Sequence, residues 1–212
     1  MPERNASRSR RQWQTQSAQA FLNVPYDAEY EDLYLAFIAG LVSFGLTPRA
    51  TIEIPSSDRR LDRIIKLIRS CRYSFHDLSR VELDTHAPAT PRFNMPFELG
   101  VAVGWSRTGG RANQWFVLES TAHRLEKSLS DLNGTDPFIH GGQPRGILAA
   151  LSNALSRPGR GQRLSDLERV FADLKVAAQE IRRDASGHSL FEARPFHELV
   201  ISASEISRRR LR

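Results

Sequence analysis

The sequence predicts an α/β fold with a mainly parallel, five-stranded sheet of flavodoxin-like order. Short apolar runs alternate with amphipathic helical stretches through residues 18–157, which is typical of strand–helix–strand units. Such units are joined by right-handed crossovers. Hydrophobic residues make up 40% of the 212 residues and charged residues 25%, which is a globular composition. In open sheets of this kind, ligands bind beyond the carboxyl ends of the strands.

Five strands are expected, each as a short apolar run bounded by turn residues. They cover residues 18–26, 47–54, 72–79, 113–120 and 136–140, the last being the weakest. Helices are expected between them, beginning after Asp27 and covering residues 56–71, 97–107 and 143–156, while residues 125–134 read as a short helix or a loop. Asp27 is suited to cap the first helix, and Pro144 to the first turn of the last. Cys71 ends an apolar helical stripe, so we interpret it as a core residue rather than a nucleophile.

Three regions are predicted along the chain. Residues 1–17 are rich in Arg, Ser and Gln and are expected to form a flexible basic tail. Residues 18–157 form the α/β domain, and residues 158–212 a helical C-terminal extension. Within the extension an apolar stripe recurs at spacings of three and four between Leu164 and Ile181, followed by a last helix at about residues 197–208. The stripe is too short to argue for a coiled coil, so packing on the core is the preferred interpretation.

Composition restricts the environment and the partners. The chain holds 30 Lys and Arg against 24 Asp and Glu, a net charge of +6 concentrated at its two ends. Solubilising ends are the preferred interpretation, and a nucleic-acid interface is not expected. A single cysteine fits a reducing compartment. Neither a signal peptide nor an apolar run long enough for a membrane span is visible, so we expect a soluble, cytoplasmic protein without a membrane partner.

A candidate site lies between the third expected strand and the next helix. Asp77 ends the strand, Asn94 precedes the helix, and Glu98 interrupts its apolar start. A carboxylate among apolar residues has a raised pKa and can act as a nucleophile, a base or a partner for a developing cation. An oxocarbenium-like sugar cation forms when a C–N glycosidic bond breaks, and a fixed carboxylate would stabilise or trap it. The same residues also suit turns and helix caps, and spacing alone leaves both interpretations open.

Three strings carry a resemblance to known families. "FLNVPYD" at residues 21–27, "HDLS" at 76–79 and "FNMPFELG" at 93–100 resemble a bacterial group of TIR-like proteins, some of which act in defence or signalling. The "ELG" element is also similar to that of the nucleoside 2-deoxyribosyltransferases. The similarity covers about residues 18–157.

The resemblance implies roles for particular residues. It implies that Glu98 is the catalytic carboxylate and that Asp77 or Ser79 helps to place the sugar. Asn23, Pro25 and Tyr26 match the loop that borders the base or nicotinamide pocket. Asn94, which would hold a ribose hydroxyl, departs from the Ser or Cys that many TIR enzymes carry four residues before the Glu.

Three functions follow as hypotheses. The first is N-glycosidic bond cleavage on NAD+ or a nucleoside-type substrate, with assembly as a homo-oligomer implied by the resemblance. It needs no metal and no tightly held cofactor, since NAD+ would enter as substrate. The second is a non-catalytic module that binds a nucleotide signal or assembles. The third and weakest is nucleic-acid binding by the basic ends. The six histidines show no metal-ligand spacing, and no Walker or dinucleotide fingerprint is present.

Overall fold

The fold rests on one parallel sheet whose five strands follow the order β2-β1-β3-β4-β5. The computed structural model describes residues 18–53, 59–80, 90–108, 113–157, 161–184 and 189–211. Every neighbouring pair of strands runs parallel, which confirms the predicted α/β class and the flavodoxin-like strand order. The strands are β1 (Gln19–Asn23), β2 (Thr47–Ala50), β3 (Tyr73–Asp77), β4 (Gln114–Glu119) and β5 (Phe138–Ile139).

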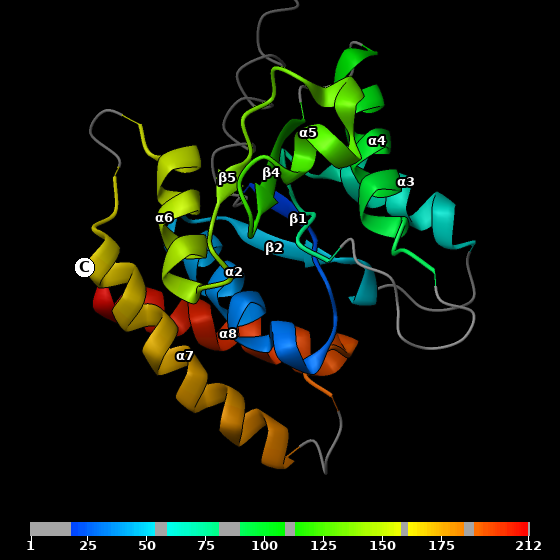
Figure 1. The fold of residues 1–212 in the computed structure, drawn as a ribbon. Helices are drawn as coiled ribbons and strands as arrows, with labels where there is room; N and C mark the ends of the chain where they lie inside the picture. Colours follow the sequence, from blue (N-terminus) through cyan, green and yellow to red (C-terminus); the bar gives the residue numbers. More distant parts are fainter. Residues whose placement is uncertain are drawn as a thin grey trace, which may run out of the picture.

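Helices cover both faces of the sheet (Figure 1). On one face lie α3 (Arg60–Ser70), α4 (Asn94–Arg107) and the short α5 (Arg124–Ser128), which pack through two apolar clusters around Phe21 and Leu99. On the other face lie α2 (Glu31–Ser43) and α6 (Pro144–Leu155). The two long C-terminal helices, α7 (Leu164–Asp184) and α8 (Ala193–Arg210), form a third layer over α2, away from the sheet.

The third layer explains why α2 is buried all round. Every residue from Leu33 to Ser43 is buried, because the sheet and α6 cover one side of the helix and α7 and α8 cover the other. The expected apolar stripe of the C-terminal region supplies this contact through Leu167, Leu174, Ala178 and Ile181. Val170 is buried with them, whereas the predicted Phe171 is only partly buried. The preferred interpretation of the stripe, packing on the core, is therefore confirmed.

Several element boundaries differ from the predicted ones. The strand expected over residues 47–54 ends at Ala50, because the Glu53 carboxylate accepts hydrogen bonds from the Ala50 N–H (3.0 Å) and Arg49 Nε (2.8 Å) and closes a 3-10 turn, Thr51–Glu53. Asp27 caps a 3-10 turn, Ala28–Tyr30, that leads into α2. The helix α4 begins three residues earlier than expected, so Asn94 is its first residue. Residues 125–134 contain α5 and a 3-10 turn, Ser130–Leu132.

The expected basic tail, residues 1–17, lies outside the described residues. No helix in the described ranges has the length and apolar character needed to cross a membrane.

Candidate functional site

Glu98 lies on the side of α4 that faces the sheet. The inward stripe of α4 consists of Met95, Glu98, Leu99 and Ala102, and Glu98 is only 3% exposed. Ala102 packs with Phe21 of β1 and with α3. Glu98 sits one turn nearer the start of α4, so it lies toward the carboxyl end of β1 and the first turn of α3. This is the edge of the sheet at which parallel α/β folds bind ligands.

The negative charge of an ionised Glu98 is only partly offset by the charged groups around it. Burial raises its pKa to about 7, because the charged form loses water, and the Arg60 guanidinium at the start of α3 opposes that rise only in part. No hydrogen bond or ion pair from another described residue reaches its oxygens. A carboxyl whose pKa is raised to near neutrality, and which no other described residue hydrogen-bonds, is suited to general acid–base or nucleophilic chemistry.

Tyr26, a predicted binding residue, lies in the loop that follows β1. Its ring packs edge-on against Tyr34 (6.3 Å between centroids) and obliquely against Phe191 (6.1 Å), and its hydroxyl lies 3.4 Å from Thr51 Oγ1. Burial raises the pKa of the Tyr26 phenol, and the Glu98 carboxylate raises it further. Tyr26 and Glu98 follow the neighbouring strands β1 and β3, so both belong to segments beyond the carboxyl ends of those strands.

The other residues of the first loop and of α4 have different surroundings. Asn23 is buried, and its side-chain amide contacts the Met95 carbonyl and His76 Nδ1, both at 2.9 Å. It therefore ties the first turn of α4 to the ends of β1 and β3. Pro25 is buried, whereas Asn94 is exposed at the helix start. Their predicted contacts with a substrate stay predictions.

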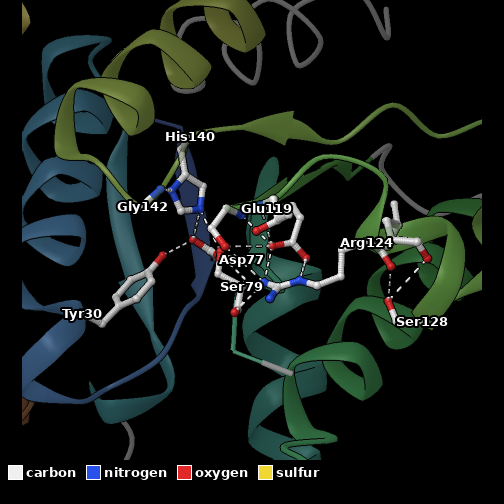
Figure 2. Close-up of polar contacts among 11 residues, drawn as sticks. Tyr30, Asp77, Ser79, Glu119, Arg124, Ser128, His140 and Gly142 are labelled. Atoms are coloured by element: carbon white, nitrogen blue, oxygen red, sulfur yellow. Dashed lines mark hydrogen bonds and ion pairs between the residues drawn. The ribbon is translucent and has the colours of Figure 1, made fainter. Parts of the chain in front are cut away.

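Asp77 and Ser79 belong to a separate polar cluster at the carboxyl edge of the sheet (Figure 2). Asp77 is fully buried and its carboxylate accepts hydrogen bonds from the Tyr30 hydroxyl, the Ser79 hydroxyl and the Ser79 N–H (2.8 Å). His140 Nε2, just past β5, lies 3.1 Å from Asp77 Oδ2. Adjacent strand residues point to opposite faces, so Asp77 turns toward α2 and α6 while His76 turns toward α4. Asp77 and Glu98 thus flank the sheet rather than share one cavity wall.

The Ser79, His140 and Asp77 constellation does not form a nucleophilic triad. His140 Nδ1 accepts a hydrogen bond from the Gly142 N–H (3.1 Å), so the proton of a neutral imidazole sits on Nε2. That nitrogen lies 2.8 Å from Ser79 Oγ, and the Ser79 hydroxyl itself donates to Asp77. The ring has no free lone pair facing the serine, so it cannot accept the serine proton as a general base must.

An ion pair between a buried glutamate and a partly exposed arginine adjoins this cluster, and the sequence analysis did not predict it. Glu119 at the end of β4 is 1% exposed and pairs with Arg124 of α5, whose Nε lies 2.9 Å from Glu119 Oε2. The same guanidinium donates to the Ser79 carbonyl at 2.6 Å (Figure 2). Asp77 is a candidate because it ends a parallel strand. Glu119 at the end of β4 and His140 just after β5 have the same position, so the same criterion would have identified them.

The remaining candidates, His76 and Cys71, have structural surroundings rather than catalytic ones. His76 is fully buried, and burial lowers its pKa to about 3, so it stays neutral as the expected packed, hydrogen-bonded histidine. Cys71 is buried in the cluster around Phe21, as predicted for a core residue. Within the described ranges, no group of three or more His, Cys, Asp or Glu side chains is arranged to hold a metal ion.

Comparison of the chain with protein-family models, with curated proteins and with solved structures finds no match. The function is therefore inferred from the chemistry of the residues at the carboxyl edge of the sheet.

Proposed function

We propose that the protein cleaves an N-glycosidic bond, with Glu98 as the carboxylate that meets the sugar and NAD+ or a nucleoside-type molecule as substrate. The observation that carries this proposal is the burial of Glu98, with a raised pKa and without a hydrogen-bonded partner among the described residues, at the ligand-binding edge of a parallel sheet. The TIR-like resemblance of residues 93–100 supports the same assignment.

The reaction can be written with these groups. The C–N bond breaks and its electron pair leaves with the base, while positive charge develops on the sugar ring. The ionised Glu98 either stabilises that cation or bonds to the sugar carbon, and water then releases the sugar. Nicotinamide leaves NAD+ as a neutral molecule, so that substrate needs no proton donor. A neutral nucleoside base needs a proton, which favours NAD+ as the substrate of a site whose proposed acid, Glu98, acts in its ionised form.

The surroundings of Glu98 suit this chemistry. A carboxylate held away from water interacts more strongly with a developing cation than one in bulk solvent. Tyr26, in the loop after β1, would supply an aromatic ring for contact with a planar base. Asn94 would contact a ribose hydroxyl from the exposed start of α4.

The alternative is a non-catalytic module that binds a nucleotide or assembles. One observation favours it. The second acid proposed for the site, Asp77, is occupied by Tyr30, Ser79 and His140 and lies on the other face of the sheet. The Glu98 carboxylate alone is sufficient for binding a cationic ring without cleaving it.

The test is incubation of the protein with NAD+ and, separately, with common purine and pyrimidine nucleosides, followed by chromatography for free base. Release of nicotinamide or a nucleobase is expected, and Glu98→Gln should abolish it while leaving the folded state intact. Glu205→Gln, an exposed glutamate on α8, is the matched control and should keep full activity. Activity retained in Glu98→Gln would reject the assignment, and binding without release in the wild type would favour the alternative.

A further inference from the structure

The outer face of α4 is apolar and open to solvent. Phe93, which directly precedes the helix, is 68% exposed and Phe97 is 54% exposed. Phe93 continues the helical geometry, since its carbonyl accepts a hydrogen bond from the Phe97 N–H at 3.0 Å. Surface helices normally place charged residues outward. Here the only charge between residues 93 and 106 is Glu98, which faces the sheet.

Two exposed glycines continue the same stripe. At about 100° per residue, Phe93, Phe97, Gly100 and Gly104 fall within roughly 60° of one another around the helix. Gly100 and Gly104 are exposed, and a Cβ added at either would meet no atom within 4 Å. Half of the stripe therefore projects as two large rings, and the other half is a flat surface at which a second helix can approach closely.

The spacing makes the stripe complementary to itself. Phe93 and Gly104 lie equally far from the point between Glu98 and Leu99, and so do Phe97 and Gly100. If two copies of α4 meet antiparallel about a two-fold axis at that point, each phenylalanine faces a glycine of the other copy. An isologous two-fold contact requires this self-complementarity of one surface patch. Antiparallel helices also bring their opposite dipole ends together.

We infer that the protein forms a two-fold symmetric homodimer through the outer faces of two antiparallel α4 helices. A phenylalanine has on the order of 200 Å² of surface, so the four rings expose roughly 500 Å² between them. Covering them removes a similar area from the partner surface, which brings the contact to about 1,000 Å², where specific dimers begin. The inference does not depend on the proposed glycosidic chemistry, because Glu98 lies on the other side of the helix.

Sedimentation velocity at micromolar concentrations tests the dimer. The wild type should sediment as a dimer, and Gly104→Leu should be a monomer at the same concentration because the new side chain fills the space of the partner's Phe93. Gly104 has open space within its own chain and helical glycine is unfavourable, so the variant should melt at the same temperature as the wild type or higher. Loss of the dimer therefore cannot be ascribed to unfolding. Ile201→Glu, which removes a residue 59% exposed on α8, is the control and should stay dimeric.

Cysteine cross-linking tests the orientation. Mixed Phe93→Cys and Gly104→Cys chains should form a disulfide-linked pair on mild oxidation, whereas either variant alone should not. Two copies of position 93 would lie about 16 Å apart along the helices at 1.5 Å per residue, beyond the reach of a disulfide. The native Cys71 is buried and does not compete. A monomeric wild type, a dimer that survives Gly104→Leu, or equal cross-linking of the single variants would each overturn the inference.

Discussion

Burial raises the pKa of the Tyr26 phenol and the Glu98 carboxylate adds to that rise, although the two residues come from different crossovers of the sheet. Tyr26 follows β1 and Glu98 is in α4, which follows β3, and β1 and β3 are neighbours. A parallel sheet brings the carboxyl ends of adjacent strands together, so residues more than seventy positions apart meet at one edge. The candidate site is therefore a consequence of topology as much as of local sequence.

The stability of the protein should depend on pH through Glu98. Its pKa is about 7 in the folded state against 4.5 for an exposed carboxyl, so the folded state binds the proton more tightly. The stability this provides is fully present below pH 4.5 and is lost as the pH rises through 7. The 2.5-unit difference between those values corresponds to about 3 kcal/mol. Glu98→Gln should remove this loss and be more stable than the wild type by up to that amount at pH 8.

Urea denaturation of both proteins between pH 4 and pH 8 checks this prediction. The two free energies of unfolding should coincide at the acid end and diverge toward the alkaline end. A constant difference across the range would show that Glu98 titrates like an exposed carboxyl. The same variant should be inactive. Glu98 would then be a residue that lowers the stability of the protein but is required for its activity.

The buried pair of Glu119 and Arg124 should be needed as a pair. Arg124→Met leaves Glu119, 1% exposed, without its cation, and is expected to lower the free energy of unfolding by about 3 kcal/mol. Adding Glu119→Gln removes the uncompensated charge and should recover most of the loss. Thermal or chemical denaturation of the two single variants and the double variant measures the coupling. Additive effects would mean that the residues do not stabilise each other.

The fold was predictable because local patterns and topology agree. Strand–helix alternation, the position of Asp27 as a cap and the stripe from Leu167 to Ile181 each predict what the structure contains. The end of β2 was not predictable from the sequence. It depends on a hydrogen bond from the Ala50 N–H to the Glu53 side chain, and the periodicity of apolar residues does not show such a contact.

The site was predictable only in part. Glu98 stands out in the sequence as a lone acid in an apolar helix start, and its burial agrees with that pattern. The sequence does not show on which face of the sheet a strand-end side chain lies once the strand has ended. Asp77 was expected beside Glu98, yet Tyr30 and His140 hold it on the opposite face. Partners that come from distant loops cannot be read from spacing.

The C-terminal helices should be required for folding. Phe191 packs 5.1 Å from the ring of Tyr34, and Phe196 lies 6.2 Å from the same ring, so α2 is covered by residues beyond 157. A chain ending at residue 157 would expose this face of a helix that is buried throughout. It should be insoluble or lack a cooperative thermal transition, which circular dichroism and the soluble yield would show. A folded, cooperative fragment would instead mark residues 18–157 as an independent domain.

Two helical glycines in close contacts, Gly146 and Gly40, should respond differently to alanine. A Cβ at Gly146 of α6 would lie 2.0 Å from the His140 carbonyl oxygen, a backbone atom just before the helix. A Cβ at Gly40 of α2 would meet the end of the Leu151 side chain at 2.5 Å, and that side chain can rotate away. Alanine favours a helix by about 1 kcal/mol over glycine, which offsets part of either clash. Gly146→Ala should therefore lower the free energy of unfolding by about 2 kcal/mol or more, since the backbone must move, while Gly40→Ala should change it by less than about 1 kcal/mol.

Because the displaced backbone carries His140, the Gly146 variant should also be less sensitive than the wild type to Tyr30→Phe, which loosens the same Asp77 cluster. Equal stability of the two alanine variants in urea would show that α6 can shift without cost, and would remove the link between its first turn and the polar cluster.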